Sequence, residues 1–223
     1  MIAKELINEL IPSLSPTDSA KKAIKCMERL RINQLPVVEN GSYKGLVTEE
    51  AILASTSGGN EKAIEELPLM APKCYINPNN HFFAIIKKAY RCGINVIAVL
   101  DNNEQYIGVI TVQDTIIAFA QTSAVQSSGG IIVLSLKKTA YSLREISRLI
   151  EAEGAKILAS SIDNDHLDTT KVKLTLKINK NNLTPIIAVL EHFNYQVIAL
   201  YEEANTASVE KERLGLLMNY LNV

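Results

Sequence analysis

The sequence predicts an α+β protein made of two differently built parts. The first part is a β-α-β-β-α unit that occurs twice. The repeat is visible because the apolar pattern that starts at Ile32 occurs again from Ile94, 62 residues later. The second part reads β-α-β-β-α-β, the order of a ferredoxin-like plait. A polar stretch at 122–130 lies between the two parts and predicts a linker.

The duplication is clearest in two segments. Residues 32–39 read INQLPVVE and residues 94–101 read INVIAVLD. With one inserted residue, the run GLVT at 45–48 aligns with GVIT at 108–111. The first copy therefore covers about residues 1–60 and the second about 61–121.

Each copy predicts the same series of elements. A short extended piece with a proline precedes an amphipathic helix, then two apolar strands joined by a polar turn, then a closing helix. The extended pieces are expected near 14–16 and 76–78, the first helices at 19–31 and 81–92, the strands at 34–38, 43–47, 96–100 and 106–110, and the closing helices from Thr48 and Thr111.

The second part, residues 131–204, alternates strands and helices differently. Strands are expected at 131–136, 157–162, 172–178 and 196–201, and helices at 142–153 and 183–193. Gly154 suits a helix end and Pro185 a first helical turn. Residues 205–223 predict a C-terminal amphipathic helix, packed on its own domain or on a partner subunit.

The motifs GLVT and GVIT, each after an apolar strand such as LPVV, resemble those of a CBS domain pair, or Bateman module. The β-α-β-β-α-β part resembles an ACT domain, and the whole order resembles CBS–ACT proteins of the acetoin-utilisation type. The resemblance implies clefts for an adenosine-containing regulatory ligand: AMP, ADP, ATP or S-adenosylmethionine. It implies no permanently bound cofactor.

Composition narrows the function classes. The chain has 223 residues, of which 47% are hydrophobic and 21% charged, and its net charge is -1, which argues against nucleic acid or acidic membranes as partners. No apolar run approaches the roughly 20 residues that span a bilayer, and no signal peptide is recognisable, so a cytoplasmic protein is expected. Cys26, Cys74 and Cys92 do not suggest a disulfide framework, and Cys26 and Cys92 read as buried hydrophobes.

The strand–helix junction at 108–114 is the first candidate site. Asp114 follows Thr111 by three residues, which brings both side chains to the start of a helix. Locally, this pattern fits either a simple helix cap or a site for an anionic or hydroxyl-bearing ligand. The CBS resemblance implies that Thr111 and Asp114 hold the ligand's ribose, with Asp114 accepting hydrogen bonds from its hydroxyls.

The first copy departs from this pattern. Ala51 stands where the family has the aspartate, and Glu50 points about 100° away around the helix. A methyl group accepts no hydrogen bond. The sequence therefore predicts one competent site and one degraded site, against the alternative that both junctions are only helix starts.

The resemblance also implies the rest of the competent site. Backbone around Ile32, Asn33 and Gln34 would face the adenine, and Val109 and Ile110 would add apolar contact. Asn95 and its neighbour Val96 are neutral where the family often has basic groups for phosphates. Adenosine or AMP is therefore favoured over ATP, and Lys87, Lys88 and Arg91 are expected on a solvated helix face.

Three functions compete. The leading one is a non-catalytic sensor of an adenine nucleotide that acts in a homodimer on an unknown downstream protein. The loop 137–142 of the ACT-like part lacks glycine and carries Tyr141, so dimerisation is expected there rather than amino-acid binding. The alternative is a ligand-free interaction scaffold. An enzyme is disfavoured, because no glycine-rich phosphate loop, metal cluster or nucleophile–base motif is present.

Overall fold

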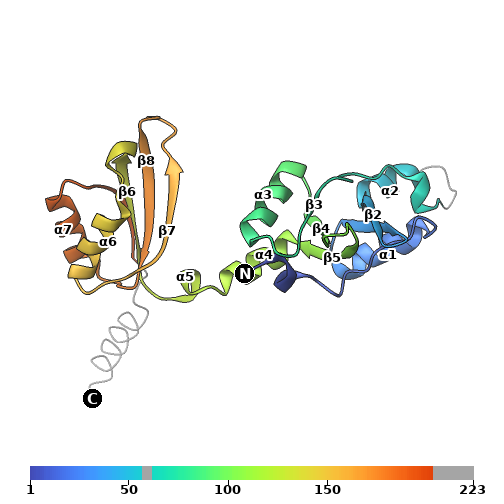
Figure 1. Ribbon diagram of the computed structural model, residues 1–223, viewed down its shortest axis with the longest axis horizontal. Coiled ribbons are helices and arrows are strands. Elements are labelled where there is room, and N and C mark those ends of the chain that lie inside the picture. The colour runs from blue at the N-terminus through green and yellow to red at the C-terminus, as the bar shows by residue number, and fades with distance from the viewer. Residues whose placement is uncertain (57–61, 203–223) are drawn as a thin grey trace, which may run out of the picture. The chain divides into compact units, whose positions relative to one another are not determined.

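The computed structural model describes residues 1–56 and 62–202, and the chain divides into two units. Unit 1 is Met1–Ala120 and unit 2 is Gln121–Val223. The predicted C-terminal helix lies outside the described residues. Figure 1 shows the elements of both units.

Unit 1 contains the same series of elements twice. The first copy comprises η1 (Ala3–Leu6), α1 (Ala20–Leu30), β1 (Gln34–Glu39), β2 (Ser42–Thr48) and α2 (Glu49–Thr56). The second comprises η2 (Ile64–Glu66), β3 (Tyr75–Ile76), α3 (Phe82–Cys92), β4 (Val96–Leu100), β5 (Tyr106–Thr111) and α4 (Val112–Ala120). The helices and strands expected from the sequence occur at these places.

Local chemistry sets the limits of the first helix of each copy. The Ser19 side chain accepts a hydrogen bond from the backbone N–H of Lys22 at the start of α1, and His81 accepts one from Phe83 at the start of α3. Both helices end at a residue in the left-handed conformation, Arg31 with φ 55° and Gly93 with φ 65°. The duplication thus extends to the helix caps.

The strands pair in matching registers. In each copy two antiparallel strands carry an irregularity beside a glycine: Val37 opposes Gly45, and Val99 opposes Gly108. A parallel contact precedes each pair, an isolated bridge from Leu14 in the first copy and β3 alongside β4 in the second. Both hairpins therefore bend at the same point.

The segment that precedes each copy pairs with the other copy. The N-terminal arm (residues 2–12) pairs with the second copy, where Ala3 N donates to Asn80 O at 2.8 Å and Asn8 N to Val109 O at 2.8 Å. The connecting arm (residues 62–72) pairs with the first copy, where Met70 and Leu46 exchange backbone hydrogen bonds of 2.8 and 2.9 Å. In Figure 1 the dark-blue N-terminus lies beside α4 before the chain reaches α1.

The motif glycines let these arms approach. A Cβ at Gly45 would lie 2.9 Å from the backbone O of Met70, and a Cβ at Gly108 would lie 2.6 Å from Ile7 Cγ2. Their φ angles, 143° and 155°, also favour glycine. The glycine of each GLVT or GVIT run is thus the point where the arm crosses the hairpin.

One hydrophobic core spans both copies of unit 1. Its fully buried members come from the strands of both hairpins and from the inner faces of the helices, among them Leu35, Leu46, Ile85, Ile97 and Ile110. The hairpin turns also meet, because Tyr106 N donates to Gly41 O at 2.9 Å. Burial at this seam raises the pKa of Tyr106 to about 12, and raises that of Tyr43 as well.

The cysteine interpretation requires a correction. Cys74, just before β3, and Cys92, the last residue of α3, form a disulfide with a Cα–Cα distance of 6.5 Å, whereas Cys26 is free and buried. Cys92 was expected to be a buried hydrophobe without a partner. The pairing depends on the packing of α3 beside β3, which residue spacing does not reveal.

In its described residues, 121–202, unit 2 has an antiparallel sheet packed against two of its helices. Its elements are α5 (Ser123–Gln126), β6 (Gly130–Lys137), η3 (Lys138–Ala140), α6 (Leu143–Ala152), β7 (Ile157–Asn164), β8 (Lys171–Ile178), α7 (Thr184–His192) and β9 (Gln196–Tyr201). The strand order is β7-β8-β6-β9. The helices α6 and α7 lie on the same face of the sheet (Figure 1), over a core that includes Ile132, Leu134 and Ile146. The expected linker contains the short helix α5.

Replacing Gly45 with alanine tests the arm crossing. We expect Gly45→Ala to lower the free energy of unfolding by about 3 kcal/mol, because the new Cβ meets the Met70 backbone and the φ angle is unfavourable for alanine. Urea unfolding followed by circular dichroism measures the loss.

Gly93→Ala is the matched control. Its φ is also positive, but nothing lies within 4 Å of the added Cβ, so the expected loss is only about 1 kcal/mol. Equal losses in the two variants would contradict a steric role for the arm.

Candidate functional site

The junction between β5 and α4 is held by reciprocal hydrogen bonds. The Thr111 hydroxyl donates to Asp114 Oδ2 at 2.6 Å, and the backbone N–H of Asp114 donates to Thr111 Oγ1 at 2.8 Å. Thr111 is therefore a helix cap, as its spacing from Asp114 allows. The same bonds fix the position of the Asp114 carboxylate, so capping and ligand binding are compatible.

A third residue, from the N-terminal arm, completes this cluster. Asn8 Nδ2 donates to Asp114 Oδ2 at 2.9 Å, across 106 positions of sequence. Every hydrogen bond to this carboxylate in residues 1–56 and 62–202 ends on Oδ2. Within the same residues, Oδ1 therefore has its acceptor capacity left for another donor.

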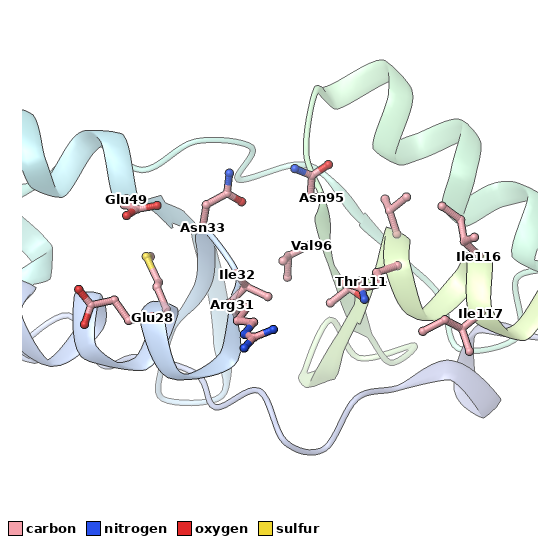
Figure 2. A pocket seen from close by; sticks show the side chains of 13 residues that line it. Glu28, Arg31, Ile32, Asn33, Glu49, Asn95, Val96, Thr111, Ile116 and Ile117 are labelled. Carbon is pink, nitrogen blue, oxygen red and sulfur yellow. The ribbon is translucent and has the colours of Figure 1, made fainter.

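A cavity of about 660 Å³ opens next to this junction (Figure 2). Its walls come from the end of α1, the starts of β1, α2 and β4, and the β5–α4 junction, so both copies contribute. The lining residues are Met27, Glu28, Arg31, Ile32, Asn33, Glu49, Asn95, Val96, Thr111, Val112, Gln113, Ile116 and Ile117. Its size falls in the range of small-molecule sites.

The walls of the cavity differ in chemistry. Ile32 and Val96 lie near its middle in Figure 2, with Ile116 and Ile117 on the side of α4, and these side chains offer apolar surface for a ring. The amides of Asn33 and Asn95 come from equivalent positions of the two copies. An apolar wall with a few convergent amides is typical of a pocket for a heterocyclic ligand.

The predicted site residues fall into three groups. Ile32, Asn33, Asn95 and Thr111 line this cavity. Asp114 instead lines another cavity, of about 460 Å³, beside the N-terminal arm and together with residues 5–10. Its hydrogen bond to Thr111 links it to the first cavity.

The other predicted residues are buried and do not line the cavity. Val109 and Ile110 belong to the hydrophobic core. Gln34 Oε1 accepts hydrogen bonds from the backbone N–H groups of Asn95 at 2.9 Å and Val96 at 3.3 Å. The Gln34 side chain thus ties the start of β4 to the first copy and positions Asn95.

Three charged residues at the cavity were not expected from the sequence. Arg31 closes α1, Glu28 lies one turn before it, and Glu49 is the first residue of α2. Two carboxylates and one guanidinium leave the lining with a net negative charge. A ligand that carries several phosphates would meet repulsion there.

The equivalent junction of the first copy lacks the polar cluster. Thr48 Oγ1 accepts a hydrogen bond from Ala51 N at 3.1 Å, so the cap is kept. Met70 takes the place that Asn8 has in the other arm, and its sulfur contacts Gln34 Nε2 at 3.8 Å. Neither Ala51 nor Met70 offers a carboxylate to a ribose.

Comparison with known families supports the interpretation of the first copy. Residues 3–58 match the family model of the CBS domain. This match confirms the CBS domain predicted there. It covers the arm, the hairpin and the capped junction of the first copy.

Two curated relatives match longer parts of the chain. An uncharacterized protein of Methanocaldococcus jannaschii is 23% identical over 185 residues, which cover 83% of this chain and 67% of that protein. The arabinose 5-phosphate isomerase of Francisella tularensis is 28% identical over 109 residues, which cover 48% of this chain. The chain spans 33% of the isomerase's length.

Solved structures were also matched. A CBS domain pair/ACT domain protein of Thermotoga maritima is 14% identical, with a TM-score of 0.48, over 54% of this chain and 98% of that one. The protein CBSX2, solved in complex with AMP, is 17% identical, with a TM-score of 0.46, over 54% of this chain and 96% of that one.

Residues 1–56 and 62–202 hold no group of three or more His, Cys, Asp or Glu side chains arranged to bind a metal ion. In the same residues, no helix combines the length and the apolar character needed to cross a membrane.

Proposed function

We propose that this protein is a non-catalytic regulator that binds an adenosine-containing, AMP-like ligand at the β5–α4 junction. The observation that carries the proposal is the Asp114 carboxylate, oriented by Thr111 and Asn8 through Oδ2, with Oδ1 left to accept a ribose hydroxyl. The CBS match of the first copy, the duplication and the neighbouring cavity support it.

The ligand's parts would divide along the site. The ribose would bond to Thr111 and Asp114, and the base would lie against Ile32 or Ile116 beside the amide of Asn33. Asn95, whose backbone is held by Gln34, would face the ligand from the second copy. Because the walls come from both copies, a bound ligand could change how the two copies pack against each other. It would do so only if it bound one packing arrangement more tightly than another.

The Asp114→Asn variant tests this function. It keeps the size of the side chain but removes the charged acceptor, so we expect AMP affinity to fall roughly tenfold to a hundredfold. Calorimetric titration with AMP, ADP, ATP and S-adenosylmethionine measures it, and urea midpoints check that the variant is folded.

The first copy supplies the control for that test. Glu50→Gln makes the same chemical change next to Ala51, in the junction that lacks the aspartate, and should leave AMP affinity unchanged. If none of the four compounds binds, the ligand-free scaffold replaces the sensor. If Asp114→Asn binds AMP as the wild type does, AMP binding does not depend on this carboxylate and the proposed site is wrong.

Charge at the cavity predicts which ligands are preferred. We expect adenosine and AMP to bind more tightly than ATP, because Glu28 and Glu49 repel additional phosphates. Removing both carboxylates, in Glu28→Gln/Glu49→Gln, should improve ATP affinity about tenfold relative to adenosine. Competition titrations give both affinities.

Arg31→Gln removes positive charge from the cavity instead of negative charge. It should weaken AMP several-fold and leave adenosine unaffected, since only AMP carries a phosphate for the guanidinium. An equal effect on both compounds would show that Arg31 shapes the cavity rather than binding phosphate.

We also propose that unit 2 joins two chains into a homodimer, through which binding reaches a downstream protein. Its edge strands β7 and β9 carry exposed apolar side chains, including Ile162 at 49% exposure and Leu200 at 42%. Exposed edges with apolar residues favour pairing with another chain.

The Ile162→Lys/Leu200→Lys variant tests the dimer. Charges on both edges should shift the mass measured by sedimentation equilibrium from that of a dimer toward 24.5 kDa, the mass of one chain. Thr175→Lys, on the central strand β8, is a control that adds a charge to the sheet and leaves the residues of both edge strands unchanged. A wild-type chain that sediments as a monomer at all concentrations contradicts the proposal.

A further inference from the structure

A second cavity, of about 590 Å³, lies along α1 and the segment before it, and cations supply much of its lining. The lining residues are Pro12, Ser13, Leu14, Ser19, Lys21, Lys22, Lys25, Cys26 and Arg29. They share none with the cavity beside Thr111, although α1 contributes to both. Four positive side chains therefore surround one hollow on the first copy.

Among the described residues, most of this positive charge has no ion-pair partner. Lys21, Lys25 and Arg29 are exposed, follow one another at four-residue spacing, and so lie on one face of α1. In residues 1–56 and 62–202, no carboxylate lies within 4.0 Å of these three. Like charges at this spacing disfavour the helix, so an anion there would stabilise it.

Lys22 differs from the other three. Its Nζ lies 2.6 Å from Asp18 Oδ1, and this hydrogen bond is the main reason why the pKa of Asp18 lies below its usual range. Lys22 is therefore already neutralised. The groups left for a ligand are three cations and the hydroxyls of Ser13 and Ser19.

The duplication provides an internal comparison. At the same offset of 62 residues, Phe83 replaces Lys21 and Ala84 replaces Lys22, whereas Lys87 and Arg91 match Lys25 and Arg29. Cys26, which also lines the cavity, corresponds to Lys88, so the second copy has three cations at these positions against four in the first. Lys88 lies over the Tyr75 ring, and Phe83 is 65% exposed. The unbroken row of Lys21, Lys25 and Arg29 therefore occurs on α1, whereas Phe83 interrupts the equivalent row on α3.

We propose that this hollow binds a compact polyanion with two or more phosphate groups, separately from the adenosine-type ligand. Guanidinium and ammonium groups donate charge-assisted hydrogen bonds to phosphate oxygens, and the serine hydroxyls add neutral donors. Several phosphates on one small molecule would meet Lys21, Lys25 and Arg29 together.

A small ligand fits these observations better than a nucleic acid. The volume is that of a small-molecule site, and the cations follow two turns of one helix. The chain's net charge is -1, so little long-range attraction for a nucleic-acid backbone is expected.

Titration with inorganic tripolyphosphate tests the inference on the full chain. At about 50 mM salt, where such contacts are only partly screened, we expect saturable binding. Lys25→Glu/Arg29→Glu should weaken it about tenfold or more. Lys87→Glu/Arg91→Glu changes the net charge equally at the matching positions of the second copy, and its affinity should stay within about twofold of the wild type.

Three outcomes would overturn the inference. They are no binding to the wild-type chain, equal losses in the two charge-reversed variants, and binding of a single-stranded oligothymidylate that competes with tripolyphosphate and depends on Lys25 and Arg29. The Asp114→Asn variant should bind tripolyphosphate normally, so this result does not depend on whether the adenosine site exists. Thermal unfolding midpoints confirm that each variant is folded.

Discussion

The exchange of arms between the two copies is the constraint on which unit 1 depends. Each arm forms backbone hydrogen bonds with the hairpin of the other copy, through Asn8 on Val109 and Met70 on Leu46. The crossing requires a glycine in each hairpin, because a Cβ would meet the arm. Neither copy can therefore fold completely without the segment that precedes the other, and one core results.

The exchange also determines the chemistry of the two junctions. The arm residue beside Asp114 is Asn8, which donates to the carboxylate, whereas the corresponding arm residue beside Ala51 is Met70. The polar pair and the apolar pair are thus each made from both copies. Both copies have the cap and the glycine, but only the second junction has the hydrogen-bonded Asn8 and Asp114 side chains beside its cap.

Sequence reasoning predicted the regular elements well, because helix periodicity, caps and the repeated GLVT and GVIT runs are local signals. It also predicted Thr111 beside Asp114, which needs only one helical turn. It missed Asn8, whose partner is 106 positions away, and the disulfide of Cys74 with Cys92. No local pattern encodes those contacts.

Local sequence patterns also did not indicate which residues line the cavity. From the sequence, Arg31 is a helix end and Glu49 a helix start. Only the packing of the two copies brings both residues to the cavity beside Thr111. Backbone around Gln34 was expected near the adenine, and no sequence pattern indicated that the Gln34 side chain bonds to the backbone of Asn95 and Val96. Strand position alone does not tell a lining residue from a bridging one.

The central claim is that only the junction containing Asp114 binds an adenosine-type ligand. Its most direct test is the calorimetric stoichiometry of AMP on the purified wild-type chain. We expect one AMP per chain, because Ala51 and Met70 leave the first junction without a carboxylate for the ribose. Two equivalents per chain, or none, would contradict it.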